Sequence, residues 1–162
     1  MVKNMENEKL MREFIADEFN NDYANSNEEV ERYMTQFEKI NNKQATWHWP
    51  AFLVGGLWML YRKMLWAFLM FMIVSGAITV LGNLLGSAGG VISDILTVAL
   101  WIGLGFAGNP LYKHYVERHL AESQDPETLR KYGGTTWKYI FIYIGVCLAI
   151  GIILAVFAIQ YN

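Results

Sequence analysis

The chain has few of the residues that build disulfides, metal sites or nucleic-acid surfaces. Its 162 residues include one cysteine, three histidines and 17% charged residues, with a net charge of −2. The single cysteine, Cys147, cannot form an intramolecular disulfide, and it lies in an apolar run where we expect it to pack as a small apolar side chain. The sequence contains no basic patch of the kind that binds nucleic acid.

Catalytic patterns are also missing from the sequence. His114 and His119 are five residues apart, whereas the two histidines of a zinc-binding H-E-x-x-H helix are four apart. His48 lies between two tryptophans, and we expect it at a membrane interface. No Ser-His-Asp set, Cys-His pair or pair of facing carboxylates stands out as a hydrolytic site. The sequence therefore predicts a protein without enzyme activity, metal or cofactor.

The charges that are present divide the chain into an acidic head and a slightly basic remainder. Residues 1–46 carry ten acids and six bases, a net charge of −4, whereas residues 47–162 carry five acids and seven bases, a net charge of +2. The first 40 residues are polar and charged, so we expect the first apolar run after them to direct membrane insertion. We interpret residues 1–46 as a cytosolic helical head.

Two short amphipathic helices are predicted in this head. The first covers residues 5–19, and the second follows a capping box of Ser26 and Glu29 and ends near Asn41. Apolar residues of the second helix recur at offsets of 3, 4, 7 and 10 and share one face: Val30, Tyr33, Met34, Phe37 and Ile40. Helices this short bury little alone, so their stripes should need each other, the membrane surface or a partner protein.

Long uncharged runs predict an all-α integral membrane protein with three transmembrane helices. Residues 64–93 contain no charge, which is more than one span requires, and a glycine-rich turn is expected within this run. About 17–20 residues cross a hydrocarbon core of ~30 Å at a rise of ~1.5 Å per residue. The membrane region, 64–162, is therefore divided into spans at about 64–82, 91–108 and 137–159, with a cytosolic loop at 109–136.

Two further features are expected around these spans. Gly108-Asn109-Pro110 should break or end the second span, with a short charged helix at 111–120 after it. Residues 47–63 are rich in aromatic and basic side chains, but their apolar run, 49–60, is too short to span, so we expect an interfacial or re-entrant segment. Its candidates for membrane-interface and lipid contacts are Trp47, Trp49, Trp58, Tyr61, Arg62 and Lys63.

Lysines and arginines near the span ends predict the orientation in the membrane. Arg62 and Lys63 precede the first span, and five further bases lie between the second and third spans, up to Lys138. Residues 82–94 and the tail after Lys138 contain no Lys or Arg. Because cytoplasmic loops carry an excess of these bases, we expect the N-terminus in the cytoplasm and the C-terminus outside.

Two patterns inside the spans could suggest binding sites, and each has a simpler explanation. Residues 103–108 match G-x-G-x-x-G, but they end an apolar span and do not follow a strand, so we expect helix packing through Ala99, Gly103 and Ala107. Asp94 is a candidate residue for an ion path because a carboxylate within a membrane is costly unless it is paired or hydrated. It follows a glycine-rich turn, so a place near a helix N-terminus is favoured.

Several motifs together resemble a known family. They are Trp47-His48-Trp49-Pro50-Ala51-Phe52, then Gly55, Trp58 and Leu60-Tyr61-Arg62-Lys63-Met64, with Tyr33–Ile40 before them and Asn109, Leu111, Tyr112 and His114 after. This pattern resembles the bacterial membrane proteins of domain-of-unknown-function family 2628 over roughly residues 14–119. The chain has Gly55-Gly56 where Gly-Pro is common in the family. The resemblance implies a multi-pass protein of the bacterial inner membrane, and the family carries no settled activity.

The leading functional hypothesis is a non-enzymatic membrane adaptor or accessory subunit that binds a protein partner through residues 1–46. The alternative is a subunit of an oligomeric transporter or channel, with Asp94 at its outer mouth and homo-oligomers enclosing the path. A lipid-modifying enzyme is the weakest reading because it lacks catalytic residues. Besides the lipid bilayer, we therefore expect a protein partner or a second copy of the chain, and no nucleic acid.

Overall fold

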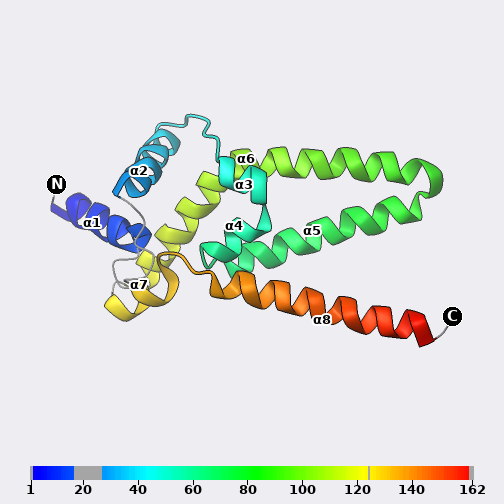
Figure 1. The fold of residues 1–162 in the computed structure, drawn as a ribbon. Coiled ribbons are helices and arrows are strands. Elements are labelled where there is room, and N and C mark those ends of the chain that lie inside the picture. Colours follow the sequence, from blue (N-terminus) through cyan, green and yellow to red (C-terminus); the bar gives the residue numbers. More distant parts are fainter. Residues whose placement is uncertain (1, 17–26, 124, 161–162) are drawn as a thin grey trace.

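A computed structural model describes residues 2–16, 27–123 and 125–160. In these residues the regular structure is helical (Figure 1). The head and the aromatic segment form α1 (Val2–Ala16), α2 (Asn27–Asn41), α3 (Trp49–Val54) and α4 (Gly56–Tyr61). The remainder forms α5 (Leu65–Leu84), a short 3-10 helix η1 (Gly86–Ala88), α6 (Gly89–Glu122), α7 (Pro126–Tyr132) and α8 (Lys138–Gln160).

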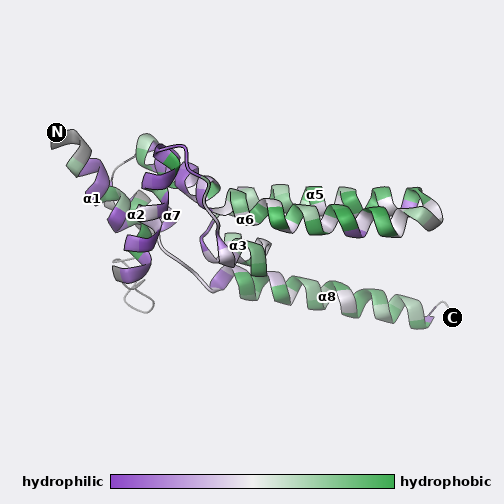
Figure 2. Ribbon diagram, turned by 90° about the horizontal axis from the view of Figure 1, so that it is seen from above, coloured by the Kyte–Doolittle hydropathy of each residue, from purple (hydrophilic) through white to green (hydrophobic). Residues whose placement is uncertain are grey.

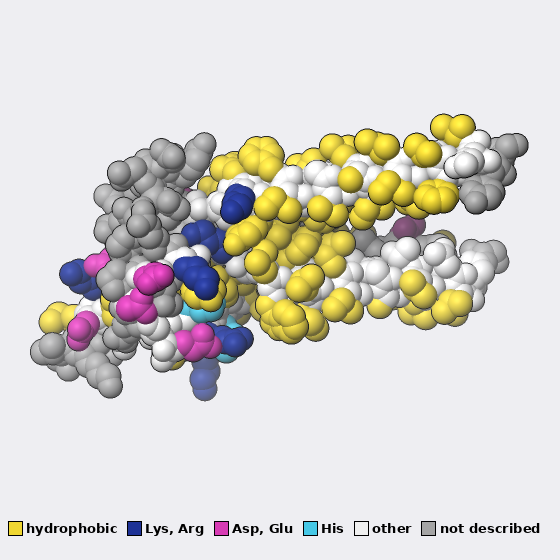
Figure 3. Space-filling view, turned by 90° about the horizontal axis from the view of Figure 1, so that it is seen from below, with side chains coloured by type: hydrophobic (Ala, Val, Ile, Leu, Met, Phe, Trp, Pro, Cys, Tyr) yellow, Lys and Arg dark blue, Asp and Glu magenta, His cyan; other side chains and the backbone are white. Residues whose placement is uncertain are grey.

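Three of these helices, α5, α6 and α8, are long and apolar enough to cross a membrane. Their apolar parts extend in one direction from the polar head (Figure 2), and one face of these parts is covered mainly with hydrophobic side chains (Figure 3). The three spans expected from the uncharged runs thus correspond to three helices. Monomeric proteins in water rarely expose so much contiguous apolar surface, so this surface fits a lipid environment.

Helix α6 corrects one expectation. The helix does not end at Gly108-Asn109-Pro110 but continues to Glu122, which gives it a total length of 34 residues. The short helix expected at 111–120 is its last part. Pro110 removes one backbone donor and pushes against the preceding turn, and α6 changes direction in this region (Figure 1). Tyr112 and Val116 beyond the proline are fully buried, so packing against the head stabilises the continuation.

The apolar stripes of the head pack on this continuation of α6. Helix α2 begins at Asn27 and ends at Asn41 as predicted, and Val30, Tyr33 and Phe37 of its stripe are buried. They form one core together with side chains from α1, α6 and α7, including Phe14, Ile15, Tyr112, Val116, Leu120 and Leu129. The stripes therefore contact each other and a helix of the same chain. The proposed cap at Ser26 and the end of the first helix, 17–19, lie outside the described residues.

The aromatic segment forms two short helices that meet at Gly55. Pro50 occupies the first turn of α3, and His48 caps this helix. Gly55 separates α3 from α4 with a φ of +50°, a backbone conformation that side-chain-bearing residues rarely adopt. The segment is bound to α6 by a hydrogen bond from the His48 N–H to the Gly105 carbonyl at 2.7 Å.

Small residues of α6 make this contact possible, but they are not the predicted ones. A Cβ on Gly105 would lie 2.4 Å from the Trp47 indole, and a Cβ on Gly108 would lie 2.8 Å from the Cβ atoms of Ala51 and His48. Gly103 has nothing within 4 Å of its Cβ position, so the expected face of Ala99, Gly103 and Ala107 packs no helix at its centre in the described chain. The packing glycines are offset from that face and receive the aromatic segment.

We predict that Gly108→Ala destabilises the protein and that Gly103→Ala does not. Both substitutions add a methyl group to the same helix and raise helix propensity by about the same amount. At Gly108 the methyl group meets atoms next to the α3 backbone, so α3 must shift, at roughly 1–3 kcal/mol. Unfolding of the two variants in detergent micelles, followed by tryptophan fluorescence, measures the difference. Equal stability of the variants would contradict the packing of α3 on Gly108.

Candidate functional site

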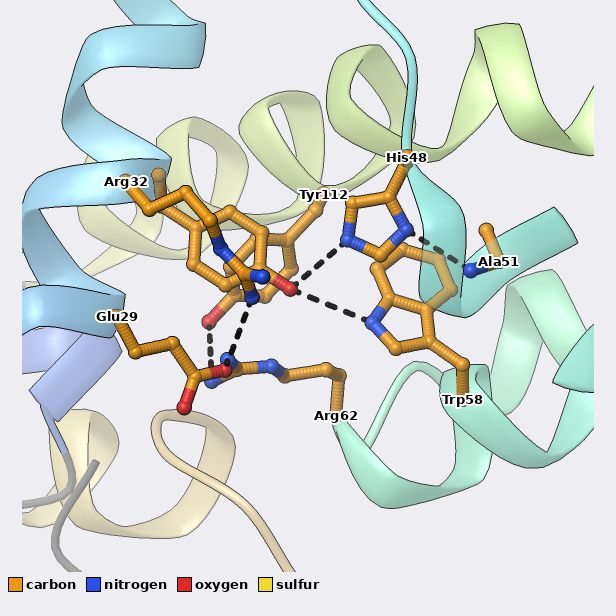
Figure 4. Close-up of polar contacts among 8 residues, drawn as sticks. Glu29, Arg32, His48, Ala51, Trp58, Arg62 and Tyr112 are labelled. Carbon is orange, nitrogen blue, oxygen red and sulfur yellow. Dashed lines mark hydrogen bonds and ion pairs between the residues drawn. The ribbon is translucent and has the colours of Figure 1, made fainter. Parts of the chain in front are cut away.

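Arg62 lies at the centre of a buried polar cluster where the head meets the spans (Figure 4). It caps the C-terminus of α4, and only 1% of its surface is exposed. Its guanidinium forms an ion pair with Glu29 of α2 and donates to the hydroxyl of Tyr112 of α6 at 3.4 Å. It also lies 4.7 Å from the ring centroid of Tyr33 and 5.0 Å from that of Tyr112. One side chain therefore joins α2, α4 and α6.

Tyr33 and His48 extend this Arg62 cluster toward α3. The Nδ1 atom of His48 accepts a hydrogen bond from the Ala51 backbone N–H at 2.9 Å, so in the neutral ring Nε2 carries the proton. Nε2 then donates to the Tyr33 hydroxyl at 3.0 Å, and Nε1 of Trp58 donates to the same oxygen at 3.4 Å (Figure 4). Tyr33 thus accepts bonds from two different helical segments while its ring packs under Arg62.

The electrostatics of the cluster hold Arg62 charged and His48 neutral. Burial alone would lower the pKa of Arg62, but Tyr112, Tyr33 and Glu29 outweigh burial and raise it. Burial, together with the positive charges of Arg32 and Arg62, lowers the pKa of His48 to about 3. Arg32 lies near the same Glu29 oxygen at 3.7 Å, but its side chain is 54% exposed. Of these two arginines, Arg62 is therefore the desolvated partner of this carboxylate.

This arrangement is better suited to holding structure than to proton transfer. A general acid or base works best with a pKa near the working pH, and neither Arg62 nor His48 has one. Both side chains also direct their polar atoms at neighbouring helices. Among the residues that the structure describes, no three His, Cys, Asp or Glu side chains are grouped to hold a metal ion. The cluster couples the head to the first span.

The structure places the six predicted interface residues in different environments. Trp49 is 62% exposed, and Trp47, Tyr61 and Lys63 are half-buried. Trp58 and Arg62 are buried within the cluster. Lys63 donates to the Gly133 carbonyl, so both cations expected near lipid phosphate have partners inside the protein. Lipid contacts of these six residues stay a prediction, and at Arg62 they would require its ion pair to open.

The remaining candidates lie apart from the Arg62 cluster. Asp94 is exposed in the second turn of α6, close to the turn that joins α5 and α6 and far from the head. Its role in an ion path stays a prediction. His48 is a buried capping residue and not the interfacial group expected from its neighbours. His114 is exposed, and His119 stacks on Tyr132 with ring centroids 4.2 Å apart.

Sequence reasoning missed the partners of Arg62. Glu29 was assigned only to a helix cap, and Tyr112 only to a family motif. A local signal exists at Arg62 itself, because Met59, Leu60 and Met64 around it are apolar and buried. A cation in such surroundings requires a buried counter-charge. The identity of that counter-charge depends on how α2 and α6 pack, which local sequence does not reveal.

A polar groove runs between α1, α2 and the last part of α6, with a volume of about 550 Å³. We call it the head groove. Its apolar floor is formed by Met11, Met34 and Phe37. Its charged side chains are Glu8, Arg12, Glu31, Glu38, Lys113 and Glu117. Arg12 is paired with Glu31 and Glu8, and Lys113 with Glu117 at 2.6 Å, so acidic charge exceeds basic charge along the groove.

The helices, their apolar surfaces and the polar head are compatible with a multi-span helical membrane protein. The sequence profile of one family, described as a protein of unknown function (DUF2628), matches residues 22–118. The chain belongs to this family, which confirms the resemblance seen in its aromatic motifs. Searches among curated proteins and among solved structures found no match.

We predict that Arg62→Met destabilises the protein far more than Arg32→Met. Both arginines approach the same Glu29 oxygen, and methionine keeps an unbranched apolar stem in each case. Removing Arg62 takes the buried cation away from Glu29, which is 29% exposed, and from the Tyr112 hydroxyl, at roughly 1.5–3 kcal/mol. An exposed pair contributes less than about 1 kcal/mol. Unfolding free energies in micelles test this. Similar losses for both variants would show that the buried pair is not central.

The titration of His48 predicts a pH dependence of stability. Its pKa is about 3 in the folded protein and 6.5 ordinarily, so between these values the unfolded chain binds more protons. Lowering the pH from 6.5 should therefore reduce the unfolding free energy, by at most about 1.4 kcal/mol per pH unit. In His48→Asn, which keeps a helix-capping side chain, this slope should be smaller between about pH 6.5 and 5, above the usual carboxylate range. An unchanged slope would contradict the assignment.

Proposed function

We propose that this protein is a non-enzymatic membrane adaptor whose acidic head binds a basic, amphipathic segment of a protein partner in the head groove. The supporting observation is the groove itself, with an apolar floor between rims in which acids outnumber bases. Methionines suit such a floor because their flexible side chains adapt to different apolar partners. A helix that presents apolar residues on one face and basic residues beside them fits this combination.

The packing of the head changes the basis of the adaptor hypothesis. The apolar stripes of α1 and α2 already have a partner in α6, so they do not by themselves call for another protein. The acidic groove is a separate feature on the outside of this core, and it lies on a head that the Arg62 cluster holds against the spans. A partner bound there would be fixed relative to the membrane.

The proposal includes a location for the head. The excess of Lys and Arg on the head side of the spans supports a cytoplasmic N-terminus in the inner membrane of a bacterium. A cytoplasmic partner with a basic segment would then meet an acidic surface, and long-range attraction would raise the rate of association more than the final affinity. Salt should weaken this binding because it screens exposed charges.

Binding of a basic amphipathic peptide to the purified full-length protein tests the proposal. We predict that Glu38→Lys, which reverses a charge that lines the groove, weakens peptide binding about fivefold to tenfold, the effect of roughly 1–1.4 kcal/mol. Glu6→Lys makes the same charge change at an exposed position of α1 that does not line the groove, and it should change binding less than about twofold.

A photo-crosslinking residue at Thr35 extends this test to native membranes. Thr35 is exposed and lines the head groove. Crosslinks to a protein partner should form there and be lost with Glu38→Lys but not with Glu6→Lys. Equal peptide binding by both variants, together with no heterologous crosslink from Thr35, would rule out the adaptor proposal.

One observation favours the alternative of an oligomeric transporter or channel subunit. Helix α8 contacts the rest of the chain near its start. There Ile140 is buried, and the ring centroid of Tyr143 lies 5.2 Å from that of Phe68. From Ile144 to Gln160 every residue is exposed, and α8 lies apart from the α5–α6 pair in Figures 1 and 2. A second copy could cover this surface as well as lipid could. Ion flux into liposomes that Asp94→Asn leaves unchanged would argue against a path at Asp94.

A further inference from the structure

A second groove, of about 380 Å³, lies between α5 and the bend region of α6. We call it the α5–α6 groove. On α5, Met70 and Val74 line it with Phe71 between them, at the offsets of one helix face. On α6, Leu100, Leu104, Leu111 and Arg118 line it, at offsets of 4, 11 and 18 that also share one face. The groove therefore follows the first half of α5 and residues 100–118 of α6.

The groove changes from apolar to cationic along this length. Val74 and Leu100 lie well inside the apolar spans, and Val74 is about 14 Å from the start of α5 at ~1.5 Å per residue. His114 and Arg118 line the opposite end, on the part of α6 beyond Pro110 that packs on the head. Trp66, which is 71% exposed and also lines the groove, lies in the first turn of α5, near the level where tryptophan favours the membrane interface.

The cation at this end is available, in contrast to the cations nearest in sequence to the first span. Arg62 and Lys63 direct their side chains to Glu29 and Gly133 inside the protein. Arg118 is 62% exposed and is paired with Glu122, one turn further along α6, at 3.0 Å. An exposed pair of this kind is weak and exchanges easily. A phosphate can accept two parallel hydrogen bonds from a guanidinium, which makes it a strong competitor for Arg118.

We propose that the α5–α6 groove binds one anionic phospholipid of the surrounding membrane. Its acyl chain lies along Met70, Val74 and Leu100, and its phosphate lies at Arg118 beside His114. The apolar part of the groove is suited to an acyl chain of the lipid. Arg118, at the end of the groove nearest the head, is suited to the negative charge of the phosphate. This site is separate from the head groove, so its test does not depend on a protein partner.

Photo-crosslinking with a phosphatidylglycerol that carries a diazirine in its acyl chain tests the site. The full-length protein is placed in nanodiscs of phosphatidylcholine with a minor share of the probe, and crosslinked residues are mapped by mass spectrometry. We expect crosslinks to concentrate on the groove residues of α5 and α6 and to exceed those on α8, whose exposed surface reports ordinary contact with bulk lipid. Unlabelled phosphatidylglycerol should compete better than phosphatidylcholine.

Matched variants separate the charge from the groove. Arg118→Gln should reduce groove crosslinking about fivefold, whereas Lys131→Gln, which removes an exposed base outside the groove, should have little effect. Val74→Trp should block the acyl chain, and Ile73→Trp, on an exposed neighbouring position outside the groove, should not. Glu122→Gln removes the internal competitor of the phosphate and should increase crosslinking.

Two results would overturn the proposal. One is a crosslinking pattern that is as dense on α8 as in the groove, which means bulk lipid only. The other is equal crosslinking in Arg118→Gln and Lys131→Gln, which means that no phosphate is bound at Arg118. All these variants change exposed side chains, so loss of folding does not explain a loss of crosslinking.

Discussion

The buried ion pair of Arg62 and Glu29 is the interaction on which the rest of the architecture depends. A guanidinium without water is stable only if charges and polar atoms surround it. Here Glu29 comes from α2 and Tyr112 from α6, so the surroundings of Arg62 are complete only when the head, the aromatic segment and the bent part of α6 are all in place. This makes the pair a strong constraint on the angle between head and spans, even though a buried ion pair is weak evidence for net stability.

The bend of α6 is the second condition for this arrangement. A helix that ended at Pro110 would leave the stripes of α1 and α2 without the helix on which both pack, and Arg62 without Tyr112. The continuing helix instead carries Tyr112, Val116 and Leu120 under the head. Gly105 and Gly108 just before the proline admit the aromatic segment close to the same helix. The bend of α6 at Pro110, the small residues Gly105 and Gly108, and the buried Arg62 therefore connect the head to the spans. We call this region the joint.

Sequence periodicity and charge were sufficient to predict much of this fold, but only its regular parts. Uncharged runs located the three long apolar helices, and the stripe of Val30, Tyr33 and Phe37 located the buried face of α2. Gly108-Asn109-Pro110 was predicted to break or end the second span; the helix changes direction there, but an end was wrong (Figure 1). Local turn signals do not contain the burial energy that holds α6 together across them. The Arg62 cluster was not predictable, because Glu29, Arg62 and Tyr112 are far apart in the sequence and meet only through packing.

The distribution of charge separates a cluster that holds structure from two grooves that are candidates for binding. Inside the joint, Arg62 is paired and His48 is neutral, which leaves little reactivity. Outside it, acids outnumber bases in the head groove, while Arg118 lies where an apolar groove leaves the spans. A negatively charged surface attracts a positively charged partner. A single cation beside an apolar groove favours an amphiphilic molecule with a negative head group. Residues of the same part of α6, 111–118, line both grooves. A lipid at Arg118 and a protein in the head groove would therefore contact one helical segment.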